Sequence, residues 1–266
     1  MRLHHVALLA SLAATAGCRG PRATAEPSAE PTPSAAPVAS SSAAPAAPAG
    51  AAKPGCAALG CRLFDSPAQA FRAILDEKPI IVAIGEAHAQ KGAEGVPSSA
   101  KRFTTELLPT LEGRASDLLV ELMAPPSGCK AKAEAVRKKQ KVVTERQADT
   151  NQNEYVTMGN EARKRGVVPD LLRPTCADMD AINTAGPDAI AASLTTIARL
   201  TKVKVKALVD RNTRAGAEKI VVTYGGAMHN DATPPRERAE WSFGPDLSAH
   251  VGESWMNSGT NMSTST

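Results

Sequence analysis

The chain has 266 residues, a formal net charge of +4 and only 3% aromatic residues. The modest positive charge is spread over predicted helical faces and is not interleaved with aromatic side chains, so the footprint of a nucleic-acid-binding protein is absent. We therefore expect no nucleic-acid partner. Residues 55–255 have the composition of a globular domain, and this length is enough for one hydrophobic core.

Residues 1–18 have the pattern of an export signal. The apolar run over residues 6–16 is shorter than the roughly 20 residues of a membrane-spanning helix and fits the hydrophobic region of a signal peptide. The small residues before Cys18 resemble a lipobox, which predicts lipidation of Cys18 and attachment to a membrane. Thr15 stands where a lipobox usually has leucine, so a plain secretory peptide cut within residues 23–25 is the alternative.

Residues 19–54 are predicted to be a disordered tether. They consist almost wholly of Ala, Pro, Ser, Thr and Gly, and Val38 is their only large aliphatic residue. Such a segment cannot bury enough apolar surface to offset the entropy lost on ordering, and its prolines favour an extended spacer. We expect a lipoprotein of the outer membrane or cell surface, with its domain in the periplasm or outside the cell.

Apolar strand-like runs alternate with helical patterns through the rest of the chain. The strands are expected at 80–84, 118–123, 167–173 and 220–224, and the helices at 66–78, 99–111, 130–147, 154–165, 187–200 and 203–217. The helix at 130–147 is highly charged and reads as a solvated insertion. This order predicts an α/β fold: a mainly parallel sheet flanked by helices and preceded by the disordered tether.

The segment after Trp255 has no hydrophobic periodicity. We expect the domain to end at residue 255 and residues 256–266 to form a disordered tail. The end is abrupt, as though a closing strand were missing.

Four cysteines remain if Cys18 carries a lipid. An even number in an oxidising compartment favours disulfides. Cys56 and Cys61 flank a short loop, which leaves Cys129 and Cys176 as the second pair. A zinc site is the alternative, but the spacing does not match a CxxC knuckle.

Two segments combine a buried-type strand, a glycine and a histidine three residues after it. They are Gly85-Glu86-Ala87-His88 and Gly226-Ala227-Met228-His229. Sites in open α/β sheets form beyond the carboxyl ends of the strands, and Glu86 and His88 point the same way in an extended segment.

Glu121 is a carboxylate within an apolar strand. Burial of an unpaired carboxylate is expensive, so Glu121 needs a partner. Glu121 therefore either belongs to a site beside His88 or forms a structural ion pair with Arg211 or Arg173.

These pieces together resemble the Tiki/TraB superfamily, which includes TraB/PrgY-like proteins, Tiki proteases, erythromycin-esterase-like proteins and haem-binding ChaN lipoproteins. The resemblance spans most of residues 66–231. It rests on the two Gly-x-x-His motifs, on Glu121 and on Arg211-Asn212 shortly before the second motif. It implies a hydrolase of a peptide or ester bond, or a haem or iron-complex carrier.

The enzyme hypothesis is a metal-dependent hydrolase acting on a small-molecule or peptide ligand. His88 and His229, with Glu86 or Glu121, would hold a divalent metal ion whose identity stays open. The metal would lower the pKa of a bound water toward about 7. The second glutamate would act as general base, and Arg211 would stabilise the oxyanion.

The binding hypothesis is the haem carrier that the ChaN resemblance implies. Haem needs a wide apolar pocket and an axial ligand, for which His88, His229 and Tyr224 are available. A catalytically inactive scaffold is the third reading.

Overall fold

The computed structural model describes residues 62–93, 95–252 and 255–258. The predicted signal peptide, Cys18, the tether and the Cys56–Cys61 pair lie outside these residues, as do residues 259–266. Within the described ranges, no helix combines the length and the apolar character needed to cross a lipid bilayer.

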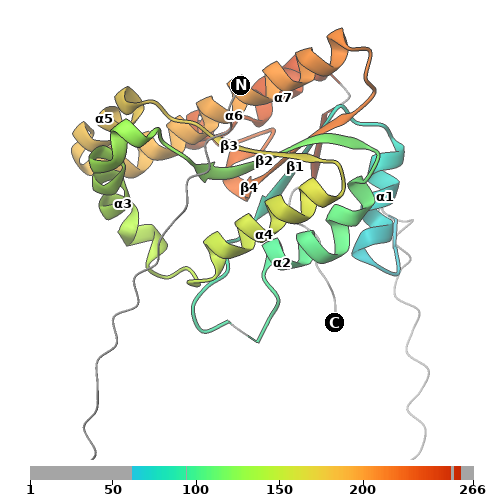
Figure 1. The fold of residues 1–266 in the computed structure, drawn as a ribbon, viewed down its shortest axis with the longest axis horizontal. Helices are drawn as coiled ribbons and strands as arrows, with labels where there is room; N and C mark the ends of the chain where they lie inside the picture. Colours follow the sequence, from blue (N-terminus) through green and yellow to red (C-terminus); the bar gives the residue numbers. More distant parts are fainter. Residues whose placement is uncertain (1–61, 94, 253–254, 259–266) are drawn as a thin grey trace, which may run out of the picture. The chain divides into compact units, whose positions relative to one another are not determined.

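A parallel five-stranded sheet in the order β3-β2-β4-β1-β5 forms the centre of the domain (Figure 1). The strands are β1 (Ile81–Glu86), β2 (Ala115–Met123), β3 (Val168–Leu172), β4 (Ile220–Gly226) and β5 (Trp255–Ser258). Every strand pair is parallel. The expected α/β fold is confirmed, and the carboxyl ends of β1, β2 and β4 meet at one edge.

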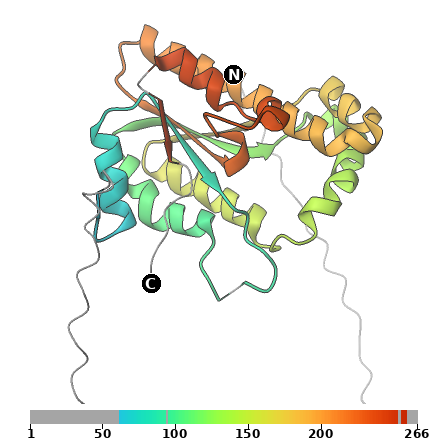
Figure 2. The same ribbon diagram turned by 180° about the vertical axis from the view of Figure 1, so that it is seen from behind.

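Helices cover both faces of the sheet, as Figures 1 and 2 show from opposite sides. One face carries α1 (Pro67–Asp76), α2 (Ser99–Arg102) and α4 (Asn151–Lys164), and the other carries α6 (Ala189–Arg214) and α7 (Gly244–Val251). The helices α3 (Lys130–Thr144) and α5 (Cys176–Thr184) lie beyond the end of the sheet. The short helices are η2 (Phe103–Leu107), η3 (Leu108–Leu111), η4 (Ser127–Cys129), η5 (Gly186–Asp188), η6 (Ala227–His229) and η7 (Arg236–Trp241).

The strands are apolar because both of their faces are buried, as parallel sheets require. In β1 the alternation splits the side chains between two cores. Val82 and Ile84 join the core under α1, α2 and α4, while Ile81 and Ala83 join the core under α6 and α7. Burial of this kind holds the strand ends, and the residues that follow them, in fixed positions.

Two sequence-based expectations are corrected here. The helices expected at 187–200 and 203–217 are one continuous helix, α6. Residues 256–258, expected in a disordered tail, belong to β5, which pairs in parallel with β1. The pairing uses backbone groups along the otherwise open edge of β1 and therefore needs no periodic side-chain pattern.

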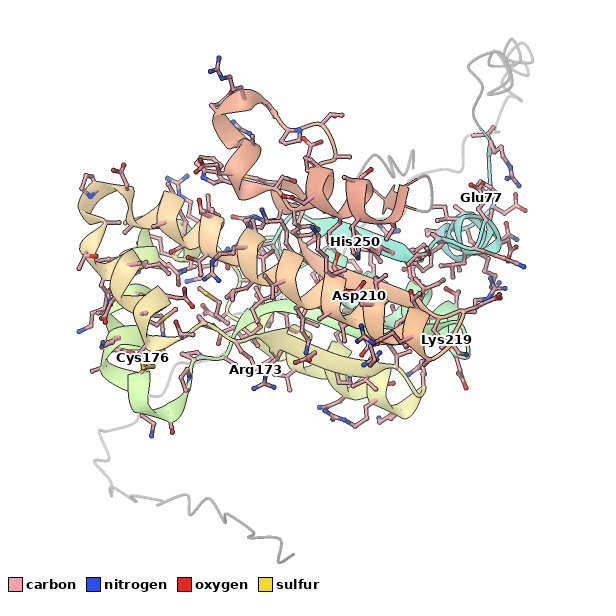
Figure 3. All side chains as sticks on the ribbon, turned by 90° about the horizontal axis from the view of Figure 1, so that it is seen from above. Glu77, Arg173, Cys176, Asp210, Lys219 and His250 are labelled. Carbon is pink, nitrogen blue, oxygen red and sulfur yellow. A yellow bond between two sulfur atoms is a disulfide. The ribbon has the colours of Figure 1, made fainter. Side chains whose placement is uncertain are left out.

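The disulfide expected between Cys129 and Cys176 is present, with the two Cα atoms 5.3 Å apart. It joins the start of α3 to the start of α5, near the label of Cys176 in Figure 3. Val136 of α3 is buried against α5, and Lys132 pairs with Asp180. The helix α3 is thus anchored to the domain on one side and is not a freely solvated insertion.

Removal of this disulfide should destabilise the domain. The bond closes a sequence separation of 47 residues, and a bridge of this kind commonly contributes about 2–4 kcal/mol to the free energy of unfolding. We expect the Cys129→Ser, Cys176→Ser double variant to unfold at correspondingly lower urea concentration. Dithiothreitol should destabilise the wild-type protein by more than the double variant, in which only the expected Cys56–Cys61 bridge is left to reduce. Equal urea midpoints for the two proteins without reductant would contradict the prediction.

Candidate functional site

The two Gly-x-x-His segments lie side by side in space. Strands β1 and β4 are neighbours, with Gly85 opposite Gly225 and Glu86 opposite Gly226. The chain leaves both strands at the same edge, so the histidines that follow arrive in one place. Glu121 joins them from the neighbouring strand β2, which pairs with β4 on its other side.

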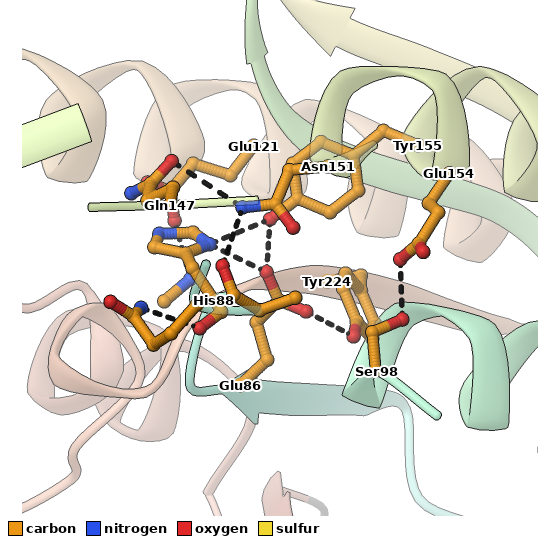
Figure 4. A network of polar contacts seen from close by, with 12 residues as sticks. Glu86, His88, Ser98, Glu121, Gln147, Asn151, Glu154, Tyr155 and Tyr224 are labelled. Carbon is orange, nitrogen blue, oxygen red and sulfur yellow. Dashed lines mark hydrogen bonds and ion pairs between the residues drawn. The ribbon is translucent and has the colours of Figure 1, made fainter. Parts of the chain in front are cut away.

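Glu86 is buried and its carboxylate accepts hydrogen bonds from three side chains (Figure 4). Oε1 accepts from the Tyr155 hydroxyl and lies 2.7 Å from Nδ1 of His88, while Oε2 accepts from the Tyr224 hydroxyl at 2.5 Å. A buried carboxylate needs such partners. Burial and the neighbouring Glu86 charge hold the pKa of both tyrosines well above the usual value, so both remain donors.

His88 is oriented by this carboxylate. Its Nδ1 faces an acceptor and therefore carries a hydrogen, which fixes the tautomer. Among the described residues nothing bonds to Nε2, and the side chain remains 31% exposed. The hydrogen bond to Glu86 raises the pKa of His88 above 6.5, against the lowering effect of burial, and the charges of Glu86 and Glu121 raise it further.

Glu121 and His229 form the second half of the site. Glu121 Oε2 accepts from the Gly226 N–H at 2.7 Å, and Oε1 lies 3.5 Å from Nε2 of His229. The buried His229 donates from Nδ1 to the Trp241 carbonyl at 2.6 Å. Its own carbonyl accepts from the hydroxyl of Ser242 at 2.9 Å. These bonds hold the imidazole with Nε2 toward Glu121.

Two glycines make room for the carboxylate of Glu121. A Cβ on Gly225 would lie 2.6 Å from the Cβ of Glu121, a clash that no relaxed structure tolerates. A Cβ on Gly226 would lie 3.6 Å from Glu121 Oε2 and 3.9 Å from Nε2 of His88. The space above Gly226 is therefore the point where the functional groups converge, and the absence of side chains there keeps it open.

Imidazole nitrogens and carboxylate oxygens are donor types that divalent cations accept. His88 Nε2, His229 Nε2 and the Glu121 carboxylate converge, and each imidazole donates its other N–H to a carboxylate or a backbone carbonyl, as metal-binding histidines do. A proton or a cation between Glu121 and Nε2 of His229 would make the approach of these two acceptors favourable. In the described part of the chain, no group of three or more such side chains is already arranged as a metal site.

The structure reassigns three residues. Arg211, expected to stabilise an oxyanion or to neutralise Glu121, instead donates two hydrogen bonds to the buried Asp117 at the opposite end of β2. Glu86 is not free to bind a metal or to act as general base, because His88 and the two tyrosines occupy its oxygens. Tyr224 is likewise held by Glu86 and does not present its hydroxyl as a haem ligand.

Sequence reasoning missed Tyr155 as a site residue and Asn230 altogether. Tyr155 lies on α4, far from the motifs along the chain, but the chain has only two tyrosines and both donate to Glu86. Asn230 follows the second motif and is buried, and its amide lies between the Gly85 N–H and the Ala227 carbonyl. It ties the two motif segments together.

A cavity of about 290 Å³ opens beside His88, Glu121 and Tyr155. Its polar lining includes Gln147 and Asn151, near the start of α4. The apolar lining comes from β2, α3, α5 and α6 and includes Met123, Val136, Met179, Ile190, Leu194 and Ile197. The site is thus accessible to a ligand through a cavity of mixed character.

The fold and the site define an α/β domain with a His/Glu cluster at the carboxyl edge of its sheet. No family model matches the chain, and no curated protein matches it. Among solved structures, the type III effector HopBA1 is similar over 59% of this chain and 72% of its own, with 18% sequence identity and a TM-score of 0.35. A similarity this low carries no argument about function.

Proposed function

We propose that the domain is a hydrolase that activates water at His88. The observation that carries the proposal is the hydrogen bond from Nδ1 of His88 to the buried Glu86, which leaves Nε2 free at the cavity and close to Glu121. A histidine held in one tautomer by a carboxylate, with its other nitrogen accessible, is the arrangement of a general base.

The proposed reaction proceeds in two proton transfers. Nε2 of His88 takes a proton from water as the water oxygen attacks the substrate carbonyl. When the carbonyl re-forms, the bond to the leaving oxygen or nitrogen breaks and the His88 imidazolium returns its proton to that atom. The products are a carboxylic acid and an alcohol or amine.

A divalent metal, if bound, would be held by His88, His229 and Glu121 and would supply a water of lowered pKa. The role of Glu86 is the same in either case: it orients His88. Elemental analysis of wild-type protein beside His229→Ala should find the metal in the wild type alone. If the metal-free protein is fully active, then His88 acts as the general base and no metal is needed.

The haem-carrier alternative is less well supported by the described residues. The cavity of about 290 Å³ is just below the range for drug-sized ligands, roughly 300–1,000 Å³, and the Tyr224 hydroxyl is held by Glu86. Haemin titration provides the comparison. A saturable Soret shift that is lost in His229→Ala would favour the carrier over the hydrolase.

The test of the hydrolase is a screen of chromogenic esters and fluorogenic peptides with purified protein. We expect turnover that falls by about 10²–10⁴-fold in His88→Ala. The matched control is His250→Ala: His250 is also partly exposed, but it pairs with Asp210 on the outer helices α6 and α7 (Figure 3). Turnover by His88→Ala equal to that of His250→Ala, or no turnover of any substrate, would overturn the proposal.

We also propose that the domain works outside the cytoplasm on a lipid anchor at Cys18. The Cys129–Cys176 disulfide supports export, because such bonds persist in oxidising compartments. The Cys18→Ser variant should move from the membrane fraction to the soluble fraction of the periplasm. An unchanged membrane pool on cell fractionation would contradict lipidation and leave the plain secretory peptide.

A further inference from the structure

We infer that the substrate of this site is an ester with an extended apolar chain, and that the chain lies in the cavity between α3, α5 and α6. The inference rests on the proposed hydrolase and goes beyond it by naming the substrate class. The first observation is that the site and the apolar residues line one continuous cavity. The same hollow is lined at one end by His88 and Glu121 and elsewhere by aliphatic side chains of four different elements.

The apolar part of the cavity extends away from the sheet. Ile197 contacts the core of the sheet, whereas Ile190 lies two turns earlier on α6, toward α5. Met179 and Val136 complete this outer part and are both almost fully buried. A ligand whose carbonyl lies at His88 therefore meets apolar side chains of β2, α3, α5 and α6 along the hollow, with polar side chains between them.

Peptides match this lining poorly. A peptide carries a backbone N–H and C=O at every residue, and each needs a partner when buried. Met179, Ile190 and Leu194 offer none. An alkyl chain needs no such partners, and each methylene that leaves water contributes a similar increment to binding. Gln147 and Asn151 lie near the start of α4, where the ester group would be. The lining also contains the α3 side chains Arg137, Gln140 and Thr144, and Ser193 of α6, whose hydroxyl donates to the Ala189 carbonyl.

The cavity wall is preformed. The disulfide Cys129–Cys176 fixes the start of α3 on α5, and Lys132 adds an ion pair with Asp180. The Asn183 side chain donates to the Lys132 carbonyl at 3.0 Å. Since α3 is held at several points, an apolar chain does not have to order this wall before it binds.

The experiment measures kcat/KM for the p-nitrophenyl esters of acetate, butanoate and octanoate with purified full-length protein. We expect about a fourfold gain for each methylene that enters the cavity, hence at least about 60-fold between acetate and octanoate if three are buried. Ile190→Trp fills the outer part of the cavity and should reduce this ratio by about tenfold.

The matched control is Val203→Trp, which places the same side chain on an exposed position of α6. It should keep the wild-type preference. Calorimetric binding of octanol against ethanol, in wild-type and Ile190→Trp protein, provides a readout that needs no turnover.

The outcomes separate the two proposals. Ester hydrolysis without a chain-length preference, or a preference that Ile190→Trp does not change, would overturn the substrate class and leave the hydrolase standing. Octanol binding that is lost in Ile190→Trp, with no hydrolysis of any ester, would support the apolar cavity and overturn the hydrolase. Absence of both binding and hydrolysis would overturn both.

Discussion

Replacement of Glu86 by glutamine should lower kcat for the proposed hydrolysis by about 10²–10⁴-fold. Glutamine has nearly the same shape, so the two tyrosines keep a hydrogen-bonding partner. The amide cannot hold the proton on Nδ1 of His88 as the carboxylate does, and it carries no charge to stabilise the imidazolium. The loss would therefore come from the tautomer and charge of His88 and not from the packing of the site.

The pH profile distinguishes this positioning role from a merely structural one. His88 must be unprotonated to act as base, and its pKa is raised above 6.5. In wild type, kcat/KM should therefore rise with pH through an inflection above 6.5. Glu86→Gln removes the charged hydrogen-bond acceptor that raises the pKa of His88 most. Burial lowers this pKa and then outweighs the charge of Glu121, which raises it, so the inflection should move to lower pH. A variant that is slow but has the wild-type inflection would contradict the assignment.

Replacement of Arg211 by alanine should cost about 3 kcal/mol of unfolding free energy, because it leaves the buried carboxylate of Asp117 without its charged partner. We place the loss at the lower end of the range for broken buried pairs, since the Arg211 side chain is half exposed. Activity per folded molecule should be retained. Glu121 lies four residues further along β2, about 13 Å away at the usual rise of a strand.

Arg214→Ala is the control for this variant. Arg214 is an exposed arginine in the last turn of the same helix, and its replacement should change stability by no more than about 0.5 kcal/mol. Urea unfolding provides the measurement. Equal stability of the two variants, combined with loss of activity in Arg211→Ala alone, would restore Arg211 to a catalytic role and overturn the reading of the ion pair as structural.

Local sequence patterns determined the class of fold and located its first four strands, although β1 and β4 each extend two residues past the ends expected at 84 and 224. The apolar runs that form β1 and β4 are recognisable because strands buried on both faces must be continuously apolar. The glycine and histidine of each motif directly follow these runs, so they too can be recognised in the sequence. The Cys129–Cys176 pairing was also predicted, from the number of cysteines and the expected compartment.

Only the tertiary structure decided which charged groups meet. The sequence left Glu121 with several possible partners. The pairing of β2 with β4 placed it near His229, while the packing of α6 on β2 brought Arg211 to Asp117. The strand order also placed β5 beside β1 without any side-chain signal. Tyr155 reaches Glu86 across 69 positions of sequence because α4 packs under the sheet. Such contacts depend on strand order, register and helix packing, and none of these is encoded in the local periodicity of one segment.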